Sequence, residues 1–321
     1  MGVTYKTPTP VIVPMNIFDP TKNCWKQACL KVEDVQKISL GEKAVLGYID
    51  DGVGINTELI NLDIERWSYF ENSGPTGEHS THGVTIISGN TFGIFPALKI
   101  VSKQVLDPIT GVGGSAEIVA AIMNLKQMGV QTINLSFGAD APDRKIEEAL
   151  KSYCDNGINI ANVSAGNDGP GPNTTDWPAN FAKNIKGVLS TAATAIDTNG
   201  NITVAVFSSR GTISISAPGH GLKTMGTNSL ITFVSGTSFS TPIVSSVIAV
   251  ARTLIDRPLY QDEILDILDH SSKHEYKVTE GGNGNIDIVE FFRQVKLLPK
   301  EYTPKNVKPK SFCERIKSYF V

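Results

Sequence analysis

The sequence predicts an α/β fold with a mostly parallel central sheet covered by helices on both faces. Short apolar runs alternate with segments of helical periodicity, which is the pattern of βαβ units. Several of the apolar runs end in polar residues, namely Asp50, Ser136 and the pair Gly166 and Asn167. Because functional sites of parallel sheets assemble beyond the carboxyl ends of the strands, these positions are the first candidates for a site.

The expected elements follow one another in regular order along the chain. Buried strands are expected over residues 44–49, 98–106, 130–136, 159–164 and 188–193. Helices are expected over residues 32–38, 115–128, 146–153 and 243–254. We predict one domain over residues 22–295, preceded by a proline-rich, extended segment at 1–21 and followed by a basic tail at 296–321.

Composition narrows the class of protein. The chain has 321 residues, 40% hydrophobic and 19% charged, with a formal net charge of −3, and it shows no basic stripe that would indicate nucleic-acid binding. No stretch approaches the ~18 apolar residues of a membrane span, and no signal peptide is visible at the N-terminus. We therefore expect no membrane span and a cytoplasmic location, with a mature fragment of a secreted protein as the alternative. The oligomeric state stays open.

The four cysteines do not form a recognised framework. They are Cys24, Cys29, Cys154 and Cys313. Four cysteines in a chain of this length are too few for a disulfide-stapled domain, and the five-residue spacing of the first two fits no common metal motif. Free thiols are the favoured interpretation.

Ser238 is the candidate nucleophile. It lies in Gly236-Thr237-Ser238-Phe239-Ser240-Thr241-Pro242, directly before an apolar helical run. A serine at a helix N-terminus is favoured for this role because the helix dipole stabilises negative charge that develops beside it. Its backbone N–H is placed to donate to an oxyanion. An N-cap serine in a Ser/Thr-rich turn is the alternative interpretation of this segment.

An acid, a base and an amide donor complete the set that amide hydrolysis requires. Asp50 ends an apolar strand and is followed by Asp51 and Gly52. Asn167 follows another apolar strand, in Ser164-Ala165-Gly166-Asn167. The chain has only five histidines, and two of them fall in His79-Ser80-Thr81-His82-Gly83-Val84-Thr85.

These four segments together resemble the subtilisin-like serine proteases, in the chain order Asp, His, Ser that is typical of that family. The likeness covers roughly residues 25–293. It implies a three-layer subtilisin-like fold and a serine endopeptidase that acts on proteins or peptides without a cofactor. It also implies a catalytic role for Asp50 and Ser238, and an oxyanion-stabilising role for the Asn167 side chain.

The histidine can be assigned in two registers. The family motif reads His-Gly-Thr-x-Val-Ala-Gly, with the catalytic histidine first. Starting at His82 keeps the glycine, as Gly83, and puts Val84 in the threonine position. Starting at His79 keeps Thr81 but loses the glycine. We favour His82 as the catalytic base on the fit of the pattern.

The resemblance also implies the residues that bind substrate. They are Ser136, Phe137 and Gly138, which would accept the peptide as an added strand, and Ser164, Ala165 and Gly166, which would form the opposite wall of the first specificity pocket. Small residues on both walls predict an open slot that accepts a large side chain.

Three departures from the family pattern lead to further expectations. Only about forty residues precede the Asp50 strand, so we expect either a mature fragment or a protein made without the pro-domain of secreted relatives. Residues 11–15 are expected either to lie over the active site, as in some intracellular relatives, or to belong to a disordered tail. The loop at residues 89–93 is short, so the main calcium site of the family is predicted to be absent, while another calcium site stays open. No other metal site is predicted.

Two other functions compete with the active endopeptidase. A subtilase-like scaffold that has lost activity would serve as a binding or structural module, and the second aspartate and Val84 keep that alternative open. An unrelated α/β hydrolase acting on esters is disfavoured, because the chain lacks the Gly-x-Ser-x-Gly elbow of that class.

Overall fold

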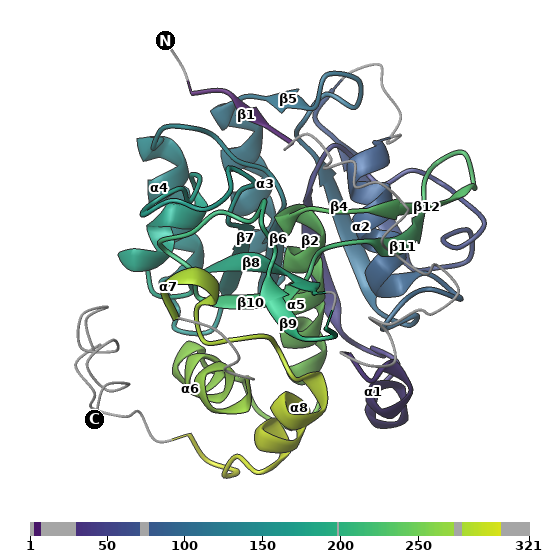
Figure 1. Cartoon of the computed structure of the whole chain (residues 1–321), viewed down its shortest axis with the longest axis vertical. Coiled ribbons are helices and arrows are strands. Elements are labelled where there is room, and N and C mark those ends of the chain that lie inside the picture. Colours follow the sequence, from purple (N-terminus) through teal and green to yellow (C-terminus); the bar gives the residue numbers. More distant parts are fainter. Residues whose placement is uncertain (1–2, 8–29, 71–76, 198, 273–277, 303–321) are drawn as a thin grey trace.

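The computed structural model describes residues 3–7, 30–70, 77–197, 199–272 and 278–302 (Figure 1). Its centre is an eight-stranded sheet. The strands of this sheet are β2 (Val45–Asp50), β3 (Ile64–Ser68), β4 (Lys99–Gln104), β6 (Thr132–Leu135), β7 (Ile160–Ser164), β8 (Val188–Ile196), β9 (Ile202–Val204) and β10 (Ile215–Pro218). They are ordered β10-β8-β7-β6-β2-β4-β3, and every pair along this path is parallel, whereas β9 pairs antiparallel with β8.

Two short antiparallel pairs lie outside the main sheet. They are formed by β1 (Tyr5–Lys6) with β5 (Val112–Gly113), and by β11 (Leu222–Met225) with β12 (Ile231–Val234). The second pair lies against the helix α2, close to the carboxyl end of β2 (Figure 1).

Helices cover both faces of the sheet (Figure 1). They are α1 (Val32–Ile38), α2 (Glu78–Ser88), α3 (Ser115–Gln127), α4 (Arg144–Cys154), α5 (Thr237–Ala251), α6 (Gln261–Ser271), α7 (Val278–Gly281) and α8 (Ile288–Lys296), with a 3₁₀ helix at Ala179–Lys183. One hydrophobic core lies between the sheet and α2 and α5, and it extends to α1, α6 and α8. A second core lies on the opposite face, under α3 and α4. This three-layer arrangement confirms the predicted fold class.

The register of the sheet brings the polar strand ends together. Ile49 of β2 is paired with Leu135 of β6, which is paired in turn with Val163 of β7. The residues that follow these three, Asp50 and two serines, therefore lie at one edge of the sheet. The helix α5 is buried along its whole length and begins at this same edge.

The structure also contains elements that the sequence pattern did not reveal. The edge strand β3 is half exposed and mixes charged with apolar residues, so it lacks the apolar run that identified the central strands.

The domain boundaries stay a prediction, because most of the segment 1–21 and the tail beyond residue 302 lie outside the described residues. Residues 11–15 and three of the cysteines, Cys24, Cys29 and Cys313, also lie outside the described residues. Cys154 is a buried free thiol.

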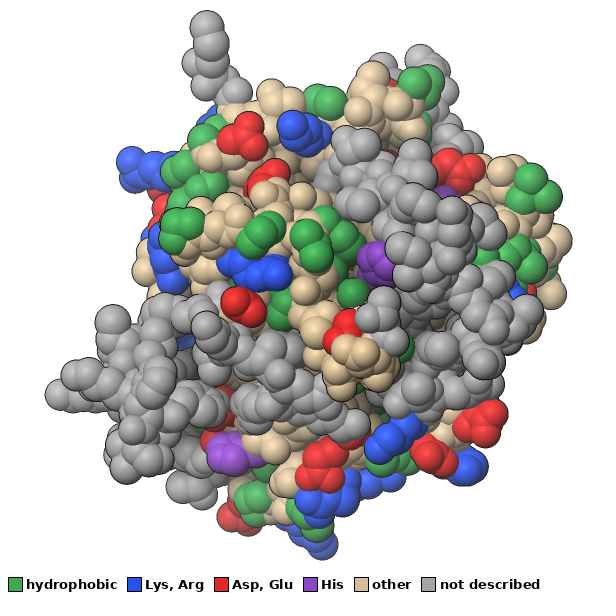
Figure 2. All heavy atoms as spheres, viewed as in Figure 1, with side chains coloured by type: hydrophobic (Ala, Val, Ile, Leu, Met, Phe, Trp, Pro, Cys, Tyr) green, Lys and Arg blue, Asp and Glu red, His purple; other side chains and the backbone are tan. Residues whose placement is uncertain are grey.

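The described residues on the face shown in Figure 2 form no single charged patch. On the face shown in Figure 2, acidic, basic and hydrophobic side chains are interspersed among the described residues. In the described part of the chain, no helix has the length and apolar character needed to cross a bilayer.

Candidate active site

Asp50 lies at the end of β2, in the middle of the sheet. Its side chain is buried, so its charge needs hydrogen-bond donors in place of water. The backbone N–H of Asp51 donates to Oδ1 at 2.8 Å. The Nδ1 atom of His79 lies 3.0 Å from each of the two carboxylate oxygens of Asp50. The buried carboxylate is thus paired directly with an imidazole from the first turn of α2.

This pairing sets the protonation of His79. Burial lowers the pKa of the imidazole, but the charge and the hydrogen bond of Asp50, with a contribution from Asp51, outweigh burial and raise the pKa of His79 above its usual value. A proton on Nδ1 is held by the carboxylate, so the neutral ring presents Nε2 as an acceptor. Within the described residues, Nε2 is buried and has no hydrogen-bond partner. The Nδ1 atom of His82 is also buried without a partner among the described residues, but His79 combines its free ring nitrogen with a contact to the buried carboxylate of Asp50.

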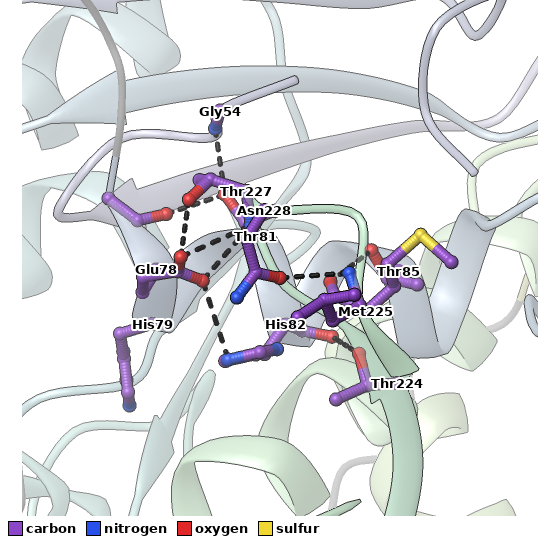
Figure 3. Close-up of polar contacts among 12 residues, drawn as sticks. Gly54, Glu78, His79, Thr81, His82, Thr85, Thr224, Met225, Thr227 and Asn228 are labelled. Carbon is purple, nitrogen blue, oxygen red and sulfur yellow. Dashed lines mark hydrogen bonds and ion pairs between the residues drawn. The ribbon is translucent and has the colours of Figure 1, made fainter. Parts of the chain in front are cut away.

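The prediction that Asp50 pairs with His82 is wrong. Nε2 of His82 lies 3.5 Å from Oε2 of Glu78, one helical turn before it, and the backbone carbonyl of His82 accepts a hydrogen bond from Thr224. Figure 3 shows this contact to Glu78, with the His79 side chain outside that group of polar contacts. Burial lowers the pKa of His82, although Glu78 opposes this change.

Two substitutions explain why the pattern favoured the wrong register. Ser80 stands where the family motif has glycine, and its hydroxyl donates to Oδ1 of Asp51 at 2.5 Å. Gly83, which resembled the motif glycine, is required for a different reason: a Cβ at this position would lie far inside van der Waals contact with the hydroxyl of Tyr48 on β2. Thr81 was the informative residue, because its hydroxyl joins Gly77 and Gly54 by hydrogen bonds.

Asp51 caps the helix that carries the histidine. Its carboxylate accepts hydrogen bonds from the backbone N–H groups of His79 at 3.1 Å and Ser80 at 2.8 Å, in the first turn of α2. These are donors that a helix leaves without partners in its own backbone. Burial, and then the charge of Asp50, raise the pKa of Asp51 to about 6, against the opposing effects of His79 and Ser80. Asp51 thus fixes the position of His79 relative to Asp50.

Ser238 occupies the second position of α5, as the sequence predicts. Its hydroxyl donates to the backbone carbonyl of Ser136 at 3.1 Å, and the Ser136 hydroxyl donates to the Ser238 carbonyl at 2.9 Å. The ring of the next residue, Phe239, lies 5.4 Å from the His79 ring between centroids. Ser238 therefore lies at the start of α5 against the end of β6, and the ring of the residue after it contacts the rings of both His79 and His82.

Asn167 follows β7 and faces the start of α5. Its Oδ1 accepts hydrogen bonds from the backbone N–H of Thr237 at 3.0 Å and from the Thr237 hydroxyl at 3.1 Å. With its oxygen held in this way, the side chain presents its N–H₂ group to any other acceptor. The structure thus orients Asn167 as a hydrogen-bond donor next to Ser238.

The segment after β6 already carries a peptide strand. Lys6 of β1 donates its N–H to the carbonyl of Gly138 at 3.0 Å, and Gly138 donates back to Lys6 at 3.1 Å. On its other side, β1 pairs antiparallel with β5. The Tyr5 side chain is fully buried and makes an edge contact with Phe137, at 5.8 Å between ring centroids. An extended peptide therefore fits between residue 138 and β5.

The structure brings together most of the predicted site residues. Asp50, Ser238, Asn167 and Ser136 lie at one edge of the sheet, and His79 takes the place predicted for His82. In the described part of the chain, the one cluster with metal-ligand spacing is Asp50, Asp51 and His79, and the contacts within the protein already engage it. One acidic residue close to the site, Asp176, was not predicted from the sequence. Its position directly before Trp177 and Pro178 was the feature that could have pointed to it.

The chain is similar to known proteins in sequence and in fold. The profile of the subtilase family, Peptidase_S8, matches residues 41–287. The thermophilic serine proteinase of Bacillus sp. (strain AK1) is 29% identical over 227 residues, which cover 67% of this chain and 53% of that protein. The thermostable alkaline protease of Halalkalibacterium halodurans is 31% identical over 224 residues, which cover 66% of this chain and 58% of that protein. The chain thus spans about half of the length of these curated relatives.

Two solved structures share the fold. The prenylagaramide maturation protease PagA has a TM-score of 0.70 at 22% identity, covering 82% of this chain and 98% of the other. Fervidolysin from Fervidobacterium pennivorans, a keratinolytic enzyme related to subtilisin, has a TM-score of 0.74 at 20% identity, covering 90% of this chain and 51% of the other.

The contact between Gly83 and Tyr48 can be tested by a double-mutant cycle. We expect Gly83→Ala to destabilise the protein by ~1–3 kcal/mol, because the added methyl group meets the Tyr48 hydroxyl. In the Tyr48→Phe background the same substitution should be neutral or stabilising, since alanine is favoured over glycine in a helix. Denaturant unfolding of the four proteins measures both effects. Equal effects of Gly83→Ala in the two backgrounds would contradict this account.

Proposed function

Because the chain belongs to the subtilase family, we propose that it is a serine-type endopeptidase with Asp50, His79 and Ser238 as its catalytic triad. The observation that supports this most strongly is the pairing of Nδ1 of His79 with the buried carboxylate of Asp50. That pairing leaves Nε2 of His79 as a basic nitrogen without a protein partner among the described residues. The Ser238 hydroxyl lies at the same edge of the sheet, where it contacts the Ser136 backbone.

In the proposed reaction, the Ser238 hydroxyl turns from the Ser136 carbonyl toward Nε2 of His79. His79 takes the hydroxyl proton while the Ser238 oxygen attacks the carbonyl carbon of the substrate. The C–N bond then breaks, and His79 gives the proton to the leaving amine. A water molecule, deprotonated by the same nitrogen, hydrolyses the acyl-enzyme and restores Ser238. Asp50 holds the imidazole in place and stabilises its protonated form.

The oxyanion of each tetrahedral intermediate requires donors that are already in place. We assign this role to the side-chain N–H₂ of Asn167 and to the backbone N–H of Ser238. Thr237 supports the assignment, because it holds the oxygen of Asn167 and so orients the amide before substrate arrives. The N-terminus of α5 adds the favourable end of a helix dipole.

Substrate would bind as an added strand between residue 138 and β5. The support for this is β1, which takes that place in the structure through hydrogen bonds to the Gly138 backbone. Main-chain pairing of this kind binds extended peptides with little regard to their sequence. We propose that protein or peptide substrates displace β1 when they enter.

Labelling with a fluorophosphonate probe tests the triad. We expect labelling of the wild type and its loss, by a factor of about 10⁴ or more in rate, in Ser238→Ala and His79→Ala. The matched variant His82→Ala removes the neighbouring imidazole and should keep its labelling rate within about threefold, a difference well below 1.4 kcal/mol. Loss with His82 and retention with His79 would reverse the assignment. A folded protein that is not labelled would favour the inactive scaffold.

The role of β1 can be tested at Lys6. Lys6→Pro removes the N–H that donates to Gly138, whereas the matched variant Lys6→Ala keeps it. Because a typical hydrogen bond contributes ~0.5–1.5 kcal/mol, weaker β1 pairing should lower the KM for peptides by about 2- to 10-fold in Lys6→Pro alone. Steady-state kinetics with one fluorogenic peptide measures this. An unchanged KM would mean that β1 does not compete with substrate.

A further inference from the structure

Residues 176–177 lie between the ends of β6 and β7. The two strands are paired along their length, but beyond them a third segment enters. The backbone N–H of Asp176 donates to the carbonyl of Ala165 at 2.8 Å, after β7. Trp177 exchanges hydrogen bonds with Ala139, after β6, at 2.8 and 3.0 Å. Residues 176–177 therefore bridge the two strand ends across the gap between them.

The carboxylate of Asp176 occupies this gap. A Cβ at Gly138, on one wall, would lie 2.5 Å from Oδ2 of Asp176. A Cβ at Gly166, on the other wall, would lie 2.6 Å from the same oxygen. Both walls thus lack side chains at the positions that face the carboxylate, and any larger residue there would collide with it.

The gap is adjacent to the proposed reacting atoms. Ser238 contacts the backbone of Ser136 at the start of one wall, and Asn167 directly follows Gly166 at the end of the other. A substrate carbonyl held between the Ser238 hydroxyl and the Asn167 amide has its own side chain one carbon away. A side chain directed between Gly138 and Gly166 would meet the carboxylate of Asp176.

Resting on the proposed function, we propose that Asp176 is the specificity-determining residue and that the enzyme cleaves after lysine or arginine. The positive charge of a lysine or arginine side chain matches the carboxylate that lies between Gly138 and Gly166. Cleavage after uncharged residues, which an open slot without Asp176 would accept equally well, is disfavoured.

The charges around Asp176 agree with a cationic ligand. Burial is the largest cause that raises the pKa of Asp176, to about 8. A hydrogen bond with Asp168 and the negative charges of Asp168 and Asp140 raise it further, while Lys6 opposes this rise. In the absence of a cation, the acidic group therefore keeps a proton near neutral pH. A guanidinium or ammonium group takes the place of that proton, and the preference for basic residues grows as pH rises from 7 to 9.

Four peptides that differ only in the residue before the fluorogenic amide test the pocket. They end in arginine, in citrulline, which has the shape of arginine without its charge, in lysine and in norleucine. A hydrogen bond to a charged group predicts a kcat/KM for arginine about 10- to 100-fold above that for citrulline, and a similar excess of lysine over norleucine. Equal or faster cleavage after citrulline and norleucine would overturn the proposal.

The variant Asp176→Asn isolates the charge. It should bring the arginine-to-citrulline ratio to within about threefold of one by slowing arginine cleavage, with the citrulline rate retained. Fluorophosphonate labelling at the wild-type rate shows that the variant is folded and its triad assembled. Asp155→Asn, at the end of α4 on the opposite edge of the sheet, makes the same change remote from the site and should keep the wild-type ratio. An unchanged ratio in Asp176→Asn would overturn the proposal.

Binding separates this proposal from the peptidase activity itself. In Ser238→Ala, which removes the nucleophile, peptides ending in arginine and in citrulline are compared by calorimetry. If the wild type cleaves no peptide and is not labelled, the proposed activity fails. Tighter binding of the arginine peptide, by the same 10- to 100-fold and lost in Asp176→Asn, still supports the acidic pocket, and equal binding overturns it.

Discussion

The pairing of Asp50 with His79 is the interaction on which the rest of the site depends. A carboxylate buried at the centre of a parallel sheet is costly unless donors replace the lost water. The fold meets this requirement with one backbone N–H and one imidazole, both aimed at Asp50. The imidazole contact fixes the tautomer of His79 and leaves its other nitrogen free. The same contact meets the structural need of the sheet and, in the proposed mechanism, the chemical need for a base.

The departures of this chain from the family motif are physically connected. Asp51, the second aspartate, which directly follows β2, caps α2 through the backbone of His79. Ser80 replaces a glycine and supplies another donor to Asp51. Gly83 leaves room for the Tyr48 hydroxyl. Taken alone, each departure would suggest a loss of activity, yet in the structure each has a partner that accounts for it. These contacts favour an assembled site over an inactive scaffold.

The sequence predicted the fold class, the order of the central strands and helices, and the positions of Asp50 and Ser238. These depend on local signals: apolar runs that end in polar residues, and a serine before a buried helix. The histidine could not be decided in this way, because the space around Gly83 depends on Tyr48, which is distant in sequence. Asp176 was missed for the same reason, since only the folded chain brings it between Gly138 and Gly166. Contacts of this kind are set by tertiary packing and leave no periodic pattern.

The pKa values of the two neighbouring histidines are shifted in opposite directions from the usual value of histidine. Measuring these two shifts tests the account most directly. NMR titration of the imidazole protons, assigned with His79→Gln and His82→Gln, measures both. The Asp50 carboxylate should hold the pKa of His79 above 6.5, and burial should hold that of His82 below 6.5. Asp50→Asn should lower the pKa of His79 and leave that of His82 in place. If His82 had the raised pKa and responded to Asp50→Asn, His79 would not be the partner of Asp50 and the proposed mechanism would be wrong.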